Sequence, residues 1–262
     1  MLSVVAELAR ARKQKVSLCY MNHDCEDIRA SGVHGVQFPA DRCQANQLVY
    51  GHGISPDFAS YWHLPADRLR WITMVREPMA WVLSNYKQRV ANNATGYAGI
   101  TFDQCVLKGL CGFTYYNFLI GPVQDGATPF EELWMRYLDA ENRLVMINER
   151  YQESTRRLAR FLGATPKELS LMMEVQERDR LNVKPNHLYS VDLSEQSLSI
   201  LEAKLNTDFK AYDMALEKFE LGKAASSKSS TGLLDRARAG RGFCVEQLKG
   251  KPNMFRLSVY MD

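Results

Sequence analysis

The sequence has no hydrophobic run that approaches the ~20 apolar residues of a membrane span, and its opening segment lacks the apolar core and cleavage site of a secretory signal. It also lacks the phosphate-loop pattern Gly-x-x-x-x-Gly-Lys-[Ser/Thr] and any obvious magnesium-binding carboxylate. The second absence argues against a nucleotide kinase. Read literally, the lack of a membrane span and of a secretory signal predicts a cytosolic chain.

The sequence also has only a small excess of positive charge, because the formal net charge is +3 and the isoelectric point is about 8.5. A surface that follows the phosphates of a nucleic acid needs a much larger basic excess, so nucleic acid is not indicated as a partner. A compact anion held by a few Arg and Lys residues fits better. With 262 residues, 46% of them hydrophobic, the chain can bury one large core, which excludes disorder throughout.

Predicted strands alternate with predicted helices over most of the chain. The clearest strand is 69–75, which is apolar on both faces, as in a parallel sheet covered by helices on both sides. Further strands are expected at 15–21, 47–52 and 143–148, and helices at 3–13, 78–89, 101–110, 129–139, 152–162 and 165–175. A last helix, capped by Asp192 or Ser194, is expected to continue to at least Tyr212. This order predicts an α/β fold with a central, mostly parallel sheet, whose ligands lie at the carboxyl ends of the strands.

The last part of the chain differs from the rest. Residues 223–230 are small and polar, and the following segment is basic, with little periodicity. We therefore expect one domain over residues 1–220 and a basic, mobile tail over residues 221–262.

The segment 73–78, Thr-Met-Val-Arg-Glu-Pro, carries the clearest chemical signal. Arg76 lies at the end of the predicted strand, Pro78 suits the first turn of a helix, and Ser84 follows on that helix. An arginine fork and a hydroxyl can hold one phosphate from two sides, beside the positive end of the helix. The alternative is an ordinary surface pair between Arg76 and Glu77, with a Ser packed in the helix.

This unit resembles the 3′-phosphate-binding segment of sulfotransferases, in which a strand, Arg-Asp-Pro and a helix precede a Ser eight positions after the Arg. Glu77 stands in place of the usual Asp. Other segments resemble, in the same order, the membrane-bound carbohydrate O-sulfotransferases that include heparan sulfate 2-O-sulfotransferase and the galactose 3-O-sulfotransferases. These segments are the Gly-His-Gly at 51–53, the Phe-Asp-Gln-Cys at 102–105, the segment 145–154, and a last helix with Asn206, Asp208 and Tyr212.

The resemblance implies a P-loop-like sulfotransferase fold and transfer of a sulfuryl group from 3′-phosphoadenosine 5′-phosphosulfate to a carbohydrate hydroxyl of a glycan or glycoconjugate. Arg76 and Ser84 would bind the 3′-phosphate, and His52 would be the general base. An imidazole with a pKa of ~6.5 at a strand end suits that role, although a structural histidine that caps the strand is the alternative. The family also implies a location in the Golgi lumen as a type II membrane protein.

One feature of the family is absent. In these enzymes a first strand ends in a loop, typically Pro-Lys-Thr, whose amides and lysine bind the 5′-phosphosulfate, and no such loop occurs in this sequence. The helix that begins near Ser3 is placed like the one that follows that loop. The resemblance therefore implies a domain without its first strand and donor loop. The alternative is an inactive or binding-only protein with the sulfotransferase fold.

Two features favour the secretory pathway over the cytosol. Asn93-Ala94-Thr95 is a glycosylation acceptor, and Cys105 and Cys111 lie close together in the sequence. From the residues alone, buried free thiols are the favoured interpretation of the cysteines. The resemblance implies a local disulfide between the two.

No metal site is expected. The nearest candidate ligands are His23, Cys25 and Cys43. His23 and Cys25 lie close together in the sequence, but no second close pair of ligands accompanies them.

Overall fold

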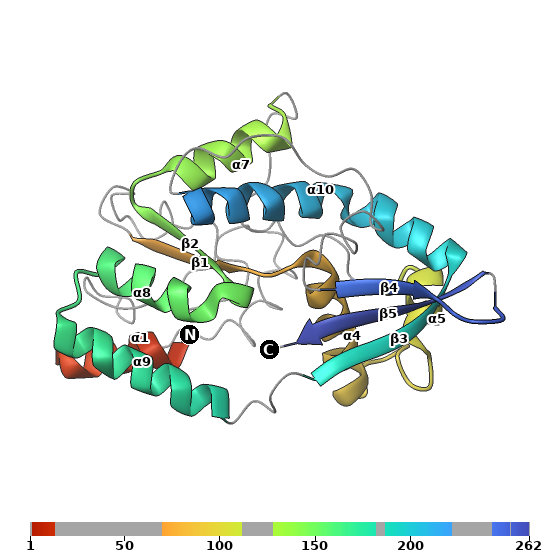
Figure 1. Ribbon diagram of the computed structural model, residues 1–262, viewed down its shortest axis with the longest axis horizontal. Coiled ribbons are helices and arrows are strands. Elements are labelled where there is room, and N and C mark those ends of the chain that lie inside the picture. The colour runs from red at the N-terminus through yellow and green to blue at the C-terminus, as the bar shows by residue number, and fades with distance from the viewer. Residues whose placement is uncertain are drawn as a thin grey trace, which may run out of the picture.

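The computed structural model describes residues 2–13, 70–111, 128–181, 187–221, 243–251 and 253–261. Helices and strands are mixed along this part of the chain, and the strands form two separate sheets (Figure 1). The chain is therefore of mixed α/β composition, as the sequence predicted. The strands expected at 15–21 and 47–52 lie outside the described residues.

The first sheet is parallel and joins β1 (Trp71–Val75) to β2 (Arg143–Ile147). Both strands lie where the sequence predicted strands. Their register pairs Trp71 with Arg143 and Val75 with Ile147, so the two strands end side by side. Whatever follows β1 and β2 in the sequence therefore meets at one edge of the sheet.

One face of this sheet is covered by α7 (Phe130–Asp139) and α10 (Glu195–Leu221), which lie above the strands in Figure 1. Val75 and Ile147 point to this face and pack with the fully buried Trp134. The indole nitrogen of Trp134 donates a hydrogen bond to the backbone oxygen of Ala211 at 2.8 Å, which fastens α7 to α10. Burial of such large apolar side chains is the main stabilising contribution to this layer.

The opposite face is covered by α8 (Tyr151–Phe161), α1 (Leu2–Ala11) and α9 (Pro166–Leu181). Met146 points to this side, where it packs with Leu158 of α8 and Val4 of α1. Helices on both faces explain why the strands are apolar throughout, as expected for a parallel sheet.

The helix α4 (Pro78–Ala91) begins two residues after β1 ends, with Pro78 in its first turn, as predicted. Its buried side includes Met79, Leu83 and Tyr86, and these residues pack away from the parallel sheet into a separate core. The short helix α5 (Phe102–Leu107) joins the same core.

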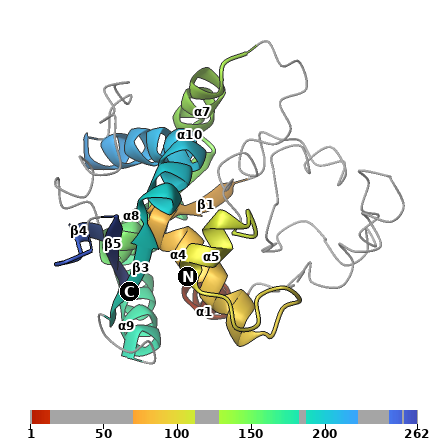
Figure 2. The ribbon, with the colours of Figure 1, turned by 90° about the vertical axis from the view of Figure 1, so that its right-hand side faces the viewer.

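The second sheet is antiparallel and was not predicted. It consists of β3 (His187–Ser194), β5 (Met254–Met261) and β4 (Phe243–Gln247), in the spatial order β3-β5-β4. Leu193 and Leu257 are fully buried against α4, α5 and α10. Figure 2 shows α4 and α5 lying on one side of this sheet.

This sheet corrects the expectation of a basic, mobile tail for the strands at 243–247 and 254–261. The apolar Val245 and Phe255 pack towards the core, whereas the neighbouring Glu246 and Arg256 are exposed. Such alternation is typical of a half-buried strand. Because β5 pairs along its whole length with β3, sixty or more residues earlier in the sequence, its stability as a strand depends partly on a distant partner.

Candidate functional site

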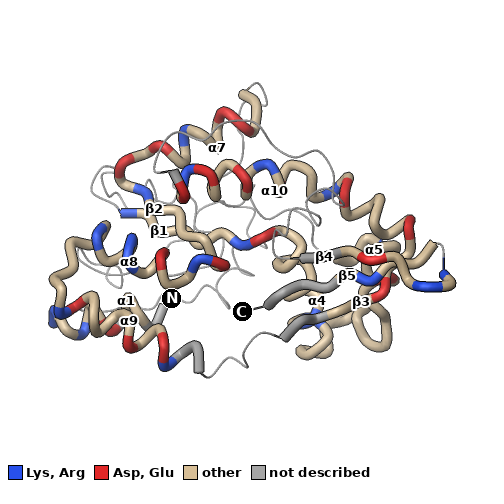
Figure 3. The backbone as a smooth tube through the Cα atoms, in the orientation of Figure 1, with Lys and Arg blue, Asp and Glu red and all other residues tan. Residues whose placement is uncertain are grey.

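The candidate site lies at the carboxyl ends of β1 and β2. Arg76 and Glu77 follow β1, and a 3-10 helix, η2 (Asn148–Arg150), follows β2. Because the strands are parallel and in register, these two segments are neighbours. Figure 3 shows basic and acidic stretches of backbone side by side at this edge. The predicted position for a ligand in an α/β fold is therefore also the place where charged residues converge.

Glu77 is the most unusual residue of this edge, because it is only 2% exposed. Its Oε2 accepts a hydrogen bond from the backbone N–H of Ala80 at 2.7 Å and so caps the start of α4. Its Oε1 is buried without a hydrogen-bond partner among the described residues. Burial raises the pKa of Glu77 to about 8, and the charge of Glu149 adds to this effect, while the backbone bonds and Arg76 oppose it. Glu77 is thus largely protonated at neutral pH.

Glu149 connects β2 with β1 and α10. Its Oε1 accepts from the backbone N–H of Glu77 at 3.0 Å, and its Oε2 accepts from the Tyr212 hydroxyl at 2.9 Å. Burial, together with the charge of Glu149, raises the pKa of Tyr212, so the phenol remains a donor. The two bonds hold the backbone immediately after Arg76 in place.

Arg76 and Lys87 form the cationic part of the site. Burial lowers the pKa of Lys87, and the positive charge of Arg76 lowers it further. Ser84 lies one helical turn before Lys87 on α4. Arg76 thus precedes α4, and Ser84 and Lys87 follow along it.

Two sequence expectations for this segment need correction. The alternative of a surface pair between Arg76 and Glu77 is wrong, because Glu77 is buried and bonded to the helix. The expectation that the positive end of α4 meets the ligand is also incomplete, because the Glu77 carboxyl group already occupies the Ala80 N–H. That N–H is therefore not open to an anion.

Lys87, Glu149 and the burial of Glu77 were not assigned roles from the sequence. Lys87 could have been found, since it follows Ser84 by three positions on a helix that was predicted. The burial of Glu77 could not, because it depends on how β2 and α10 cover the start of α4.

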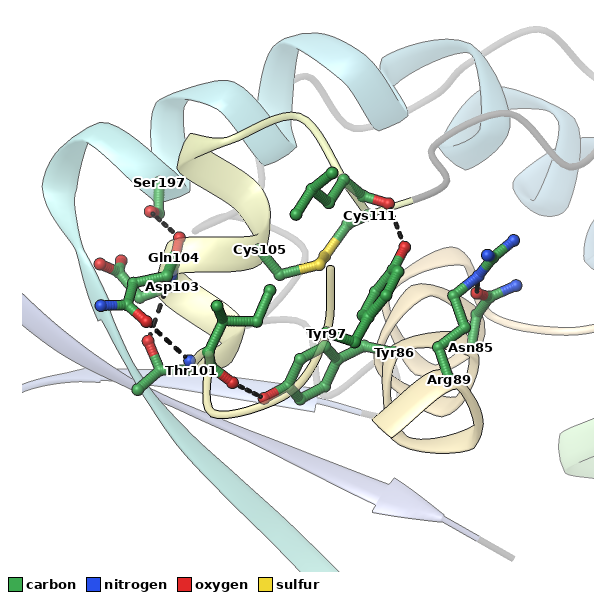
Figure 4. The surroundings of a disulfide bond; sticks show 12 residues. Asn85, Tyr86, Arg89, Tyr97, Thr101, Asp103, Gln104, Cys105, Cys111 and Ser197 are labelled. Carbon is green, nitrogen blue, oxygen red and sulfur yellow. Dashed lines mark hydrogen bonds between the residues drawn. A yellow bond between two sulfur atoms is a disulfide. The ribbon is translucent and has the colours of Figure 1, made fainter. Parts of the chain in front are cut away.

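The remaining predicted residues divide into two groups. His52, and the metal candidates His23, Cys25 and Cys43, lie outside the described residues. Cys105 and Cys111 form a disulfide, as the resemblance implied. Figure 4 shows this bond next to Tyr97, whose hydroxyl bonds to the backbone oxygen of Leu110.

The helix α5 is fastened to the second sheet beside this disulfide. The Asp103 carboxylate accepts from both the backbone N–H and the hydroxyl of Ser194, at 2.7 and 2.8 Å. At the start of α5, Thr101 and Gln104 form a capping box. These contacts fix the residues around the disulfide independently of the candidate site.

A scan of protein-family models, a search of curated proteins and a search of solved structures each find no match to this chain. Within the described ranges, no group of three or more His, Cys, Asp or Glu side chains is placed to hold a metal ion. None of the described helices is both long and apolar enough to cross a membrane.

Proposed function

We propose that the chain has a sulfotransferase fold and transfers a sulfuryl group from 3′-phosphoadenosine 5′-phosphosulfate to a carbohydrate hydroxyl. The observation that carries this proposal is the order of Arg76, which follows β1, and of Ser84 and Lys87 on the next helix, α4, with the charge of Arg76 acting on Lys87. An arginine fork, a hydroxyl and a second cation are the groups that bind a terminal phosphate dianion. The 3′-phosphate of the nucleotide is such a group.

The protonation of Glu77 is compatible with this role. A buried carboxylate beside the site would repel a phosphate, whereas a neutral carboxyl group does not. The raised pKa of Glu77 keeps it uncharged through the neutral range. Glu149, the other carboxylate at this edge, is engaged by two hydrogen-bond donors. The balance of charge open to a ligand therefore favours an anion.

The chemical step would use residues beyond the nucleotide site. The acceptor hydroxyl oxygen forms a bond to sulfur as the bond from sulfur to the phosphate oxygen breaks, and the hydroxyl proton passes to a base. His52 is the proposed base, on the resemblance of its Gly-His-Gly segment alone. The second product is adenosine 3′,5′-bisphosphate, which contains the 3′-phosphate that Arg76, Ser84 and Lys87 would hold.

Calorimetry with the full chain tests the nucleotide site. Adenosine 3′,5′-bisphosphate should bind at least tenfold more tightly than 5′-AMP, because only the former carries the 3′-phosphate. Arg76→Ala should weaken bisphosphate binding about 10- to 100-fold, and Lys87→Ala should weaken it less. Arg89→Ala is the matched control, because Arg89 lies on the same helix but bonds to Asn85 and stacks on Tyr97.

Equal affinity for the two nucleotides, or no loss with Arg76→Ala, would contradict the proposed site. Transfer of labelled sulfate to a panel of glycans then tests the reaction itself. Binding of the bisphosphate without transfer to any glycan would favour the alternative of a binding-only protein.

A further inference from the structure

The loop after α4 contains a feature that the proposed function does not use. Asn93-Ala94-Thr95 is the only Asn-x-Ser/Thr triplet in the 262-residue sequence. Such a triplet is the acceptor for an N-linked glycan when the chain enters the secretory pathway. Because the triplet is unique, any N-linked glycan on this protein must be at Asn93.

The triplet lies on an open turn. α4 ends at Ala91, and Asn92 and Asn93 follow as exposed residues, with Asn93 at a φ of 50°. The turn is closed by its own backbone, through a bond from Asn93 N–H to the Val90 oxygen at 3.1 Å. The side chains of Asn93 and Thr95 are both exposed, so a bulky group on Asn93 would extend into solvent without disturbing the fold.

The left-handed backbone alone could explain an asparagine here, because Asn tolerates positive φ better than most residues. The left-handed backbone at Asn93 does not explain why a threonine is found at position 95, where the residue is exposed. The two explanations make different predictions, since a glycine at position 93 would satisfy the backbone but could not carry a glycan.

The surroundings of the turn indicate the compartment. Tyr97, just beyond the triplet, is buried and bonds through its hydroxyl to Leu110, next to the Cys105–Cys111 disulfide (Figure 4). The triplet and the disulfide thus belong to one packed unit. Disulfides persist in the oxidising compartments of the secretory pathway, where N-linked glycans are also attached.

The turn also lies at the other end of α4 from Arg76. α4 has 14 residues, and a helix of that length spans roughly 21 Å. Arg76 lies two residues before the helix begins, and Asn93 lies two residues after it ends. A glycan on Asn93 would therefore stand at the opposite end of α4 from Arg76.

We propose that Asn93 is an N-glycosylation site, placed on the turn after α4 so that its glycan extends into solvent. The modification forms a bond from the anomeric carbon of the first sugar to the Asn93 side-chain nitrogen, which loses a proton, as the bond from that carbon to a lipid-linked pyrophosphate breaks and the pyrophosphate leaves. It does not depend on sulfuryl transfer. Failure of the proposed function would leave it unaffected.

The test is to secrete the full chain from eukaryotic cells behind a cleavable signal peptide and to map its peptides by mass spectrometry. Peptide N-glycosidase should release a glycan and convert Asn93 to Asp, with heavy oxygen incorporated from labelled water. Thr95→Ala and Asn93→Gly should abolish the glycan, whereas Thr95→Ser and Asn92→Gln, which keep the triplet, should retain it. An unmodified Asn93 peptide as the main species of secreted parent protein would overturn the proposal, even if the variants fail to fold.

Discussion

Two glutamates lie at the starts of two helices, and their environments are opposite. Glu77 at the start of α4 is buried, and its pKa is raised to about 8. Glu168 in the first turn of α9 is bonded by Arg12 and by the backbone N–H of Thr165, and these contacts lower its pKa to about 2. The surroundings therefore destabilise the ionised form of the carboxyl group at Glu77 and stabilise it at Glu168.

The difference separates the candidate site from a region held together by ion pairs and hydrogen bonds. Arg12 donates to both Glu168 oxygens, at 2.7 and 3.1 Å, and to the backbone oxygens of Leu162 and Gly163. Those contacts fasten α1 to the turn between α8 and α9, and each charge has a partner. Glu77 lacks such an arrangement, and it lies where the charged ends of the parallel strands meet. Perturbed carboxyl groups of this kind are typical of binding sites.

The largest expected effect concerns Glu77. A raised pKa means that the folded protein binds a proton that the unfolded chain releases, so the free energy of unfolding should fall as the pH rises from about 4.5 to about 8. Glu77→Gln keeps the cap on Ala80 but cannot ionise. The substitution should remove this fall in the free energy of unfolding, which is on the order of 3–5 kcal/mol. The variant should therefore be more stable than the parent above pH 8.

Urea denaturation at pH 5 and pH 9 measures this effect. The matched control is Glu141→Gln, because Glu141 is an exposed glutamate away from this edge. If the free energy of unfolding changed with pH equally in the parent and in Glu77→Gln, the pKa of Glu77 would not be raised by burial.

The sequence was a good guide to the region around the parallel sheet. β1 and β2 are mostly apolar, α4 begins at Pro78, and α8 ends before Gly163, which has a φ of 61°. These signals are local, so they can be seen in the sequence without knowing the fold. For the same reason, Arg76 could be placed after a strand and Ser84 on the helix that follows.

The sequence was a poor guide to the second sheet and to the charges of the site. β5 pairs with β4 across a short turn, but its other partner, β3, lies sixty or more residues earlier in the sequence. The raised pKa of Glu77 likewise arises from burial between segments more than seventy residues apart. The pairing with β3 and the burial of Glu77 follow from tertiary contacts, which no local pattern encodes.

A smaller effect is expected at the other helix start. Arg12→Ala should lower the free energy of unfolding by about 1–2 kcal/mol, because it removes charge-assisted hydrogen bonds that are only partly shielded from water. The pH dependence should have the opposite sign from that of Glu77. The lowered pKa of Glu168 contributes stability that is present above about 4.5 and is lost as the pH falls towards 2.

Acid titration of the parent and of Arg12→Ala, followed by circular dichroism, measures this loss. The variant should be less stable at neutral pH and should lose less stability on acidification. Nucleotide affinity should not change, and a loss of adenosine 3′,5′-bisphosphate binding in Arg12→Ala would mean that the two regions are coupled.

The smallest effect is expected for Thr165→Ala. The Thr165 hydroxyl accepts from the backbone N–H of Glu168 at 3.3 Å and donates to Glu168 Oε2 at 3.0 Å. The bond from the Thr165 backbone N–H to the same oxygen survives the substitution, as does the pair with Arg12. The loss should therefore be about 0.5–1 kcal/mol in urea denaturation at pH 7, and Thr165→Ser should restore it. If Thr165→Ala lowered stability more than Arg12→Ala, the helix cap, and not the ion pair, would be the main stabilising contact at the start of α9. The contrast between Glu77 and Glu168 would then not come from the charged partner that only Glu168 has. It would come from how each glutamate caps its helix.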